Sequence, residues 1–171
     1  MARKTGVLPV QRIALADGVF TAVWSERGLF RLIFPQTVSV PERAAPGTRL
    51  PEKTALSAWQ ETLAELLAVY FSGRAVDFSS VPVDFEGYTP FQRRVLSVVR
   101  QVPYGKVTTY GNVAREIKQA RAARAVGQVM KRNRTMLVIP CHRVLGQNGL
   151  GGFSCGTSFK ECLLRLEGIL C

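Results

Sequence analysis

Short apolar runs separated by turn residues mark the first third of the chain. Residues 13–16 and 19–24 flank Asp17-Gly18, a strong turn signal for a β-hairpin, and residues 29–34 form a third apolar run. The pattern predicts a small antiparallel meander of three strands.

Helical spacing begins after a proline-rich, loop-like stretch at residues 35–52. Apolar residues recur every three or four positions over residues 54–72, and Gly73 suits the end of a helix. The apolar positions are Trp59, Leu63, Leu66, Leu67 and Tyr70. Residues 74–88 lack periodicity and are interpreted as a linker. Since this half shows no catalytic cluster, we expect it to give mainly structural support.

Two capping boxes are expected in the second half. Thr89 can cap a helix that opens with Pro90, and Gln92 supplies the reciprocal bond. Ser158 and Glu161 repeat the pattern and predict the start of the last helix, which ends near residue 167.

Two further helices are predicted between these capping boxes, one from Thr108 or Thr109 through residue 117 and one over residues 121–131. Residues 118–120 contain no glycine or proline, so propensity alone would let the two merge. Small residues lie among long cations here, a mixture that lets a helix approach nucleic acid closely. The cations are Arg115, Lys118, Arg121, Arg124, Lys131 and Arg132. An alanine-rich surface helix is the alternative, and the local charge favours DNA contact.

Charge is distributed unequally along the chain. Residues 1–86 hold nine basic and nine acidic residues, whereas residues 87–171 hold fourteen basic and three acidic ones, so the whole net charge of +11 lies in the second half. This asymmetry indicates a polyanionic partner, most often nucleic acid. A solvated basic face explains less well why one half is neutral.

Length and composition suit one ordinary domain or two small ones, because 171 residues with 47% apolar content can bury a core. The basic N-terminus resembles the start of a signal peptide, but Gln11 and Arg12 interrupt the apolar stretch behind it. No window is long and apolar enough to span a membrane. We expect a soluble intracellular protein, cytoplasmic and nucleoid-associated if prokaryotic.

Cysteine occurs only near the C-terminus, at Cys141, Cys155, Cys162 and Cys171. Reduced thiols are expected in a chain of this size without a secretion signal. The chain has a single histidine and no Cys-x-x-Cys pair, so no metal site is predicted.

The candidate chemistry lies around Cys141, which follows the apolar run 137–139 and Pro140 and precedes His142. A thiol beside a base and a cation can be a nucleophile, because the thiolate is the reactive form. Neighbours in an extended segment point to opposite faces, so a bridging water or a tight turn would have to link the two side chains. A buried structural cysteine beside a surface histidine is the alternative. The glycine-rich residues 146–152 lack the Gly-Lys-Ser/Thr ending of a phosphate loop, and that interpretation is rejected.

Several short motifs occur in one order along the chain and together resemble the O6-alkylguanine-DNA alkyltransferase family, whose members are also called methylated-DNA–protein-cysteine methyltransferases. They are Thr89-Pro90-Phe91-Gln92, Pro103-Tyr104-Gly105-Lys106, Thr109-Tyr110-Gly111, Ala123-Arg124-Ala125-Val126-Gly127, Pro140-Cys141-His142-Arg143-Val144 and Leu166-Glu167-Gly168. The match covers about residues 65–171, and the part before it agrees only in its α/β character.

The resemblance implies a two-part fold. An α/β, ribonuclease H-like support domain with a small antiparallel sheet and a helix would cover residues 1–78, followed by a linker over 79–88. A mainly α domain over 89–171 would carry a winged or helix-turn-helix DNA-binding motif and the catalytic residues.

The resemblance also implies roles for individual residues. Cys141 would accept the alkyl group, and His142 would draw off the thiol proton through a water, with Glu167 behind it. Asn133 would brace the turn around the site, and Tyr110 would donate a proton toward N3 of the leaving guanine. Each has a plainer alternative: a helix-end carboxylate for Glu167, a turn residue for Asn133 and a core aromatic for Tyr110.

Substrate and DNA contacts are implied in the same way. The backbone at Val144, the Ser154 region, Tyr110 and Met136 would line the base pocket. Arg124 would enter the duplex from the minor groove and fill the space left by a flipped nucleotide, unless it is only a solvated cation. The other DNA-contacting residues of the recognition helix and its end would be Arg121, Ala123, Ala125, Gly127 and Arg132.

Three departures from the family pattern change what is expected locally. Lys118-Gln119-Ala120 replaces a Gly-x-Pro turn before the recognition helix. Arg134 and Met136 stand where prolines are usual, which should alter the pocket wall. Cys155 stands where glycine is common; a bystander thiol is favoured, and oxidation with Cys141 is the alternative.

The implied function is DNA repair by direct damage reversal, a single irreversible transfer from O6-alkylguanine in double-stranded DNA, and less readily from O4-alkylthymine, to Cys141. The partner would be that DNA, with no membrane and no cofactor; the protein would act as a monomer, with cooperative binding along DNA left open. The alternative is a damage-sensing DNA-binding protein without transfer activity, against which Cys141 argues. A cysteine hydrolase is disfavoured because the only histidine is adjacent to the thiol.

Overall fold

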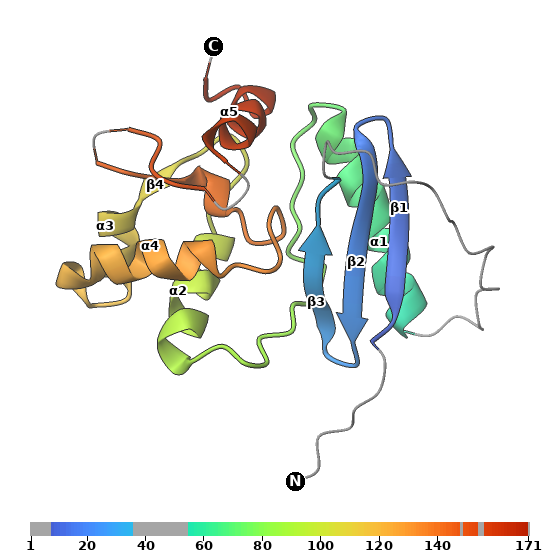
Figure 1. Ribbon diagram of the computed structural model, residues 1–171, viewed down its shortest axis with the longest axis horizontal. Helices are drawn as coiled ribbons and strands as arrows, with labels where there is room; N and C mark the ends of the chain where they lie inside the picture. The colour runs from blue at the N-terminus through green and yellow to red at the C-terminus, as the bar shows by residue number, and fades with distance from the viewer. Residues whose placement is uncertain (1–7, 36–54, 148, 154–155, 171) are drawn as a thin grey trace, which may run out of the picture.

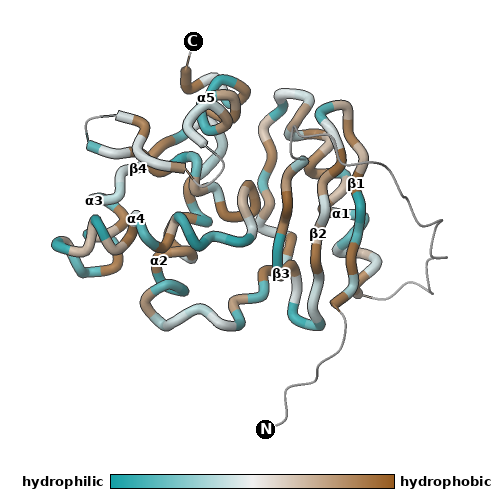
Figure 2. The backbone as a smooth tube through the Cα atoms, viewed as in Figure 1, coloured by the Kyte–Doolittle hydropathy of each residue, from teal (hydrophilic) through white to brown (hydrophobic). Residues whose placement is uncertain are grey.

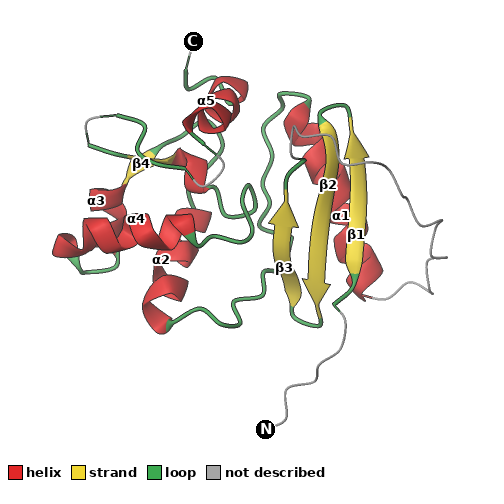
Figure 3. Cartoon of the chain, viewed as in Figure 1, coloured by secondary structure: helices red, strands yellow, loops and turns green. Residues whose placement is uncertain are grey.

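The computed structural model describes residues 8–35, 55–147, 149–153 and 156–170. Within these residues, a sheet with one α-helix forms the first part of the fold, and four α-helices with a two-stranded sheet form the second (Figure 1; Figure 3).

The N-terminal meander is confirmed. Strands β1 (Val10–Leu15), β2 (Gly18–Ser25) and β3 (Gly28–Ile33) form an antiparallel sheet in the order β1-β2-β3. The hairpin turn lies one residue earlier than predicted: Leu15 pairs with Gly18, so residues 16–17 make the turn. Gly18, the first residue of β2, has a φ of 122°, and a Cβ there would lie 2.6 Å from the Pro35 side chain, so this position requires glycine.

Helix α1 (Ala55–Phe71) covers one face of this sheet, as its apolar spacing predicts (Figure 1). Leu63, Leu67 and Tyr70 are fully buried on it, and Phe20 and Trp24 of β2 are buried beneath. A positive φ at Gly73 ends the helix.

Helix α2 (Pro90–Arg100) begins with the predicted capping box. The backbone N–H of Gln92 donates to Thr89 Oγ1 at 3.3 Å, and the N–H of Thr89 donates to Gln92 Oε1 at 2.9 Å. Two backbone donors at the helix start are therefore satisfied by side chains.

Helices α3 (Tyr110–Glu116) and α4 (Ala123–Lys131) remain separate, and Thr109 caps α3. Lys118 adopts a left-handed backbone with φ 59°, and the 3-10 turn η1 (Ala120–Ala122) leads into α4. A conformation usually reserved for glycine thus breaks the helix that propensity alone would have continued. Helices α2, α3 and α4 pack on one another, and hydrophilic positions gather along α3 and α4 away from the large sheet (Figure 2).

Helix α5 (Thr157–Leu166) does not begin as predicted. Gly156 occupies the N-cap position without a side-chain bond, so the capping box of Ser158 with Glu161 is wrong. Ser158 already lies inside the first turn, where its helical backbone cannot serve as a cap. Strands β4 (Thr108–Thr109) and β5 (Val144–Leu145) pair with each other in parallel.

Apolar side chains from both parts form one continuous core. Trp24 and Leu67 from the first part belong to the same cluster as Val95 and Ile139 from the second. In the described part of the chain no helix has the length and apolarity needed to cross a membrane.

Candidate active site

Cys141 begins a short 3-10 turn, η2 (Cys141–Arg143), that directly precedes β5. The backbone here makes a tight turn, one of the two possibilities that the sequence left open: the Cys141 N–H donates to the Ile139 carbonyl at 2.8 Å and the Arg143 N–H to that of Pro140 at 3.0 Å. Cys141 is 2% exposed and His142 is fully buried. The tight turn holds the thiol and the imidazole on one short, buried segment.

His142 is bonded to Glu167, the residue at the C-terminal end of α5. Its Nε2 lies 2.7 Å from Glu167 Oε1, and the side chains of both residues are fully buried. Glu167 therefore caps a helix and also contacts the histidine of the cysteine turn, although 25 residues separate the two in sequence.

Two further side chains complete the surroundings of Glu167. Arg143 donates from Nε to Oε2 and from Nη2 to Oε1, both at 2.9 Å. The hydroxyl of Tyr70 in α1 donates to Oε1 at 2.7 Å, and the backbone N–H of Gly105 donates to Oε2 at 3.2 Å. The carboxylate thus accepts bonds from both parts of the fold.

Sequence reasoning missed Tyr70, which it placed in the core of a purely supporting half. A usable signal was present: a tyrosine on the buried stripe of a helix needs a hydrogen-bond partner for its hydroxyl. Arg143 was noted as a cation beside the thiol, and its pairing with Glu167 could not be read from spacing.

The charges of this network fix the state of the histidine. Burial by itself would raise the pKa of Glu167, but hydrogen bonds from His142 and Arg143 lower it to about 2, so the carboxylate is ionised. Burial lowers the pKa of His142 despite the neighbouring carboxylate, which favours the neutral imidazole. Nε2 then carries the proton and donates to Glu167. Nδ1, which has no hydrogen-bond partner within the described residues, keeps its lone pair.

Asn133 ties together the loop that leads to Cys141. Its Nδ2 donates to the Ile139 carbonyl at 2.8 Å, while its Oδ1 accepts from the Thr135 N–H at 3.1 Å. The Ile139 N–H donates back to the Thr135 carbonyl at 2.8 Å. This buried asparagine therefore bonds to both ends of the loop segment before the cysteine turn.

Tyr110 lies at the start of α3 and lines a cavity of about 740 Å³ with Arg124, Gly127 and Gly152. Its hydroxyl donates to the Gly152 carbonyl at 3.3 Å. Burial raises the pKa of Tyr110, and the nearby Cys141 raises it further, so the hydroxyl remains protonated. Ser154, which was expected in this region, lies outside the described residues, as does Cys155.

Helix α4 and the turn η1 before it expose a basic face beside this cavity. Arg121, Arg124 and Ala125 are exposed, Ala123 and Gly127 are half-buried, and Arg132 is exposed just beyond the helix. The opposite face is buried and consists of Val126, Val129 and Met130. Arg124 is the basic side chain of this set that reaches the cavity wall.

Val144 and Met136 are not among the residues that line the Tyr110 cavity. Both are buried, and the Val144 carbonyl accepts a 2.6 Å bond from Lys160 Nζ in α5. Lys160 is fully buried and also donates to the Leu150 carbonyl. Burial lowers the pKa of Lys160 to about 8, and Cys141 acts in the opposite direction. Sequence reasoning missed this lysine, because nothing in the periodicity of α5 marks it as buried.

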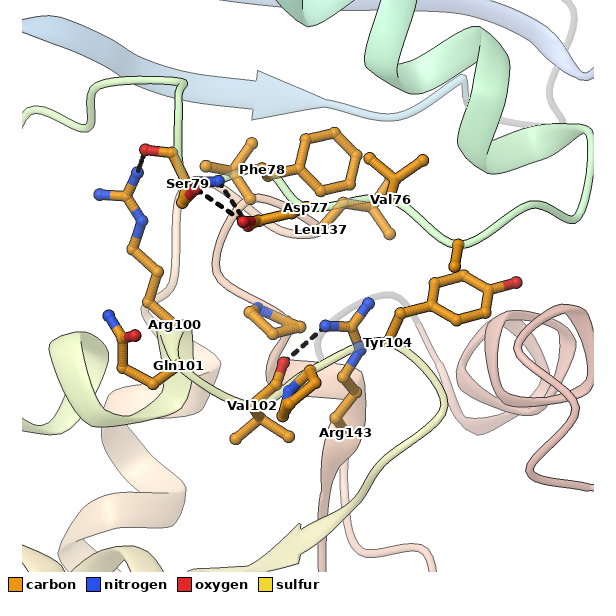
Figure 4. A pocket seen from close by; sticks show the side chains of 14 residues that line it. Val76, Asp77, Phe78, Ser79, Arg100, Gln101, Val102, Tyr104, Leu137 and Arg143 are labelled. Carbon is orange, nitrogen blue, oxygen red and sulfur yellow. Dashed lines mark hydrogen bonds between the residues drawn. The ribbon is translucent and has the colours of Figure 1, made fainter.

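A second cavity of about 510 Å³ is lined in part by Arg143 (Figure 4). Phe78, Tyr104, Leu137 and Pro140 form part of its wall, and Arg143 Nη1 donates to the Val102 carbonyl at 2.7 Å. None of the residues predicted from the sequence to contact substrate lines it. No group of three or more His, Cys, Asp or Glu side chains in the described ranges could hold a metal ion.

The sequence of this chain matches a family model and several named proteins. The family model described as "6-O-methylguanine DNA methyltransferase, DNA binding domain" matches residues 90–169. The methylated-DNA–protein-cysteine methyltransferase of Methanopyrus kandleri is 46% identical over 101 residues, which cover 59% of this chain and 75% of that protein. The chain belongs to the methylated-DNA–protein-cysteine methyltransferase family.

Other members of the methyltransferase family are similar over a comparable segment. The protein of the same name from Sulfurisphaera tokodaii is 45% identical over 103 residues, 60% of this chain and 64% of the relative. The chain thus spans somewhat less than two thirds of that relative, and the same holds for the Methanosarcina acetivorans protein, of which 65% is covered.

Solved structures of the methyltransferase family agree with the fold over nearly the whole chain. The crystal structure of the Mycobacterium tuberculosis O6-methylguanine methyltransferase matches with a TM-score of 0.71 and 28% identity, covering 94% of this chain and 92% of that one. The M. tuberculosis protein in complex with DNA matches with a TM-score of 0.73 and 31% identity, covering 93% and 92%.

Proposed function

We propose that this protein repairs DNA by taking the alkyl group of O6-alkylguanine onto Cys141 in one irreversible step. The observation that carries the proposal is the buried turn that joins Cys141 to a neutral His142, whose Nε2 is bonded to the ionised Glu167. This arrangement leaves Nδ1, on the residue that directly follows Cys141, without a hydrogen-bond partner in the described residues and able to act as a base. The printed names of the relatives, methylated-DNA–protein-cysteine methyltransferases, support a DNA substrate and a cysteine as the acceptor.

The proposed reaction begins with loss of the thiol proton to His142 Nδ1 through a bridging water. The thiolate attacks the alkyl carbon, a sulfur–carbon bond forms, and the bond from that carbon to O6 breaks. The electron pair moves into the guanine ring, and Tyr110, kept protonated by its raised pKa, donates a proton toward N3. The product is a thioether that does not hydrolyse, so each molecule acts once and needs no cofactor.

The lesion must leave the base stack before the sulfur can reach it, because O6 is otherwise enclosed in the duplex. We propose that α4 lies in the minor groove, that Arg124 fills the space left by the flipped nucleotide, and that Arg121 and Arg132 contact phosphates. The net charge of +11 supplies sequence-independent affinity. O4-alkylthymine would react in the same way, but less readily.

The division of labour between the two parts of the chain is also proposed. Residues 89–171 carry the chemistry and the DNA contacts, residues 79–88 connect, and residues 1–78 support the site. This support includes the Tyr70 hydroxyl on Glu167. A single protein molecule would serve each lesion.

Intact-protein mass spectrometry tests the proposal. Under reducing conditions, an excess of duplex with one O6-methylguanine should add one methyl group to each protein molecule, and peptide mapping should place it on Cys141. Cys141→Ser should abolish the addition, whereas Cys162→Ser, at an exposed thiol, should react like the wild type. Binding of the damaged duplex with no change in mass would favour the damage-sensing alternative and refute the transfer.

A further inference from the structure

Arg134 lies between two aromatic rings from distant parts of the chain. Its guanidinium carbon is 4.2 Å from the centre of the Phe30 ring in β3 and 4.3 Å from that of Tyr88, which precedes α2. Both distances are within the range of cation–π attraction. These three residues are here called the Arg134 stack. Since Arg134 directly follows Asn133 in the chain, the stack connects the N-terminal sheet to the loop that contains Asn133.

Hydrogen bonds fix the stack in place. Arg134 Nη2 donates to the Glu86 carbonyl at 2.7 Å, and the Leu32 N–H in β3 donates to the Arg134 carbonyl at 2.8 Å. Arg134 Nε is buried and has no hydrogen-bond partner within the described residues. The guanidinium therefore leaves one buried N–H without a bond, a cost that its contacts with the two rings must offset.

The Tyr88 hydroxyl forms hydrogen bonds with the backbone on both sides of Asn133. It donates to the Arg132 carbonyl at 2.9 Å and accepts from the Arg134 N–H at 3.0 Å, the peptide groups on either side of Asn133. A proline at position 134 could not donate the second bond because it has no N–H. The backbone of Asn133 is thus held by the same residues that form the stack.

Hydrogen bonds connect Asn133 to Cys141 through the Ile139 carbonyl. Asn133 Nδ2 is bonded to the Ile139 carbonyl at 2.8 Å, and that carbonyl also accepts the Cys141 N–H at 2.8 Å. We propose that Arg134 is a positioning residue, and that the Arg134 stack lets the N-terminal sheet set the position of Cys141. This inference rests on the proposed transfer of an alkyl group to Cys141.

Loss of Arg134 should therefore slow the transfer reaction without weakening DNA binding. Arg134 lies against Phe30 and Tyr88 instead of joining the exposed face of α4, so its loss should leave DNA affinity unchanged. A loosened loop would misplace the sulfur relative to the alkyl carbon, and misplacement by about 1 Å can cost about a hundredfold in rate.

Two measurements on Arg134→Met test the proposal, with Arg31→Met, an exposed arginine of β3, as the matched control. Hydrogen exchange should quicken at the Ile139 and Cys141 amides and stay slow in α1. The single-turnover rate constant at saturating damaged DNA should fall roughly tenfold to a hundredfold, with the half-saturating DNA concentration unchanged. Arg134→Lys should recover part of the rate, because it keeps a cation between the rings.

The outcomes separate this proposal from the proposed function. Unchanged exchange at Ile139 and Cys141, or a loss confined to the half-saturating DNA concentration, would overturn it. If the wild type transfers no methyl group, the proposed function fails, and hydrogen exchange still decides whether the stack holds the loop. Should Arg134→Met not fold, Tyr88→Phe, which keeps the ring and removes the bridging hydroxyl, is judged by the same two measurements.

Discussion

Replacing Glu167 with glutamine removes the charge on which the buried network depends. The carboxylate accepts bonds from Tyr70, His142, Arg143 and the Gly105 backbone. An amide offers one acceptor oxygen and places an NH2 group opposite donors, while the Arg143 guanidinium stays buried without a counter-charge. We therefore expect Glu167→Gln to lower both the free energy of unfolding and the rate of transfer.

Two routes give a similar magnitude for the loss of stability. The pKa of Glu167 falls from 4.5 to about 2 on folding, and at about 1.36 kcal/mol per pKa unit this corresponds to about 3 kcal/mol. Breaking a buried ion pair from one side generally costs about 3–5 kcal/mol. The loss is large against the roughly 5–15 kcal/mol by which ordinary domains are stable.

Urea denaturation from pH 7 down to pH 3 measures this effect. Because the folded pKa is depressed, the contribution of Glu167 is fully present above pH 4.5 and is lost as pH falls toward about 2. The difference between wild type and Glu167→Gln should therefore shrink below pH 4.5. Glu161→Gln, on the same helix, should change stability by less than about 0.5 kcal/mol. A Glu167→Gln loss below about 1 kcal/mol at pH 7, or one that does not vary with pH, would refute the reasoning.

Three other predictions concern DNA contact and the supporting tyrosine. Arg124→Ala should weaken duplex binding and slow transfer from duplex DNA, yet spare the reaction with free O6-alkylguanine. Arg74→Ala is the control, and an equal loss of rate on both substrates would contradict an intrahelical role of Arg124. The logarithm of DNA affinity should fall linearly with the logarithm of salt concentration, and a flat profile would exclude the basic face as the docking surface. Tyr70→Phe should cost about 1.5–3 kcal/mol in urea denaturation, since a donor to a buried carboxylate is lost; Tyr104→Phe, whose hydroxyl donates to neutral carbonyls, should cost less, and the reverse order would contradict the role of the charge.

Local rules predicted the elements well where one segment supplied its own signal. The capping box of Thr89 with Gln92 formed because both partners lie within one helical turn. The box of Ser158 with Glu161 failed because the chain enters α5 through Gly156, which has a positive φ and occupies the N-cap position two residues before Ser158. The separation of α3 from α4 at Lys118 was likewise beyond propensity, since a left-handed lysine has an intrinsic cost that packing must offset.

By itself the sequence determined the meander, the helix α1, the basic second half and the cysteine–histidine pair, because each depends on residues close together along the chain. Only the tertiary structure decided that Tyr70 bonds to Glu167 across 97 residues and that Arg134 lies between Phe30 and Tyr88. Periodicity indicates which face of an element is buried and not which partner it meets there. That choice is made when the whole core packs at once and every buried polar group must find a bond.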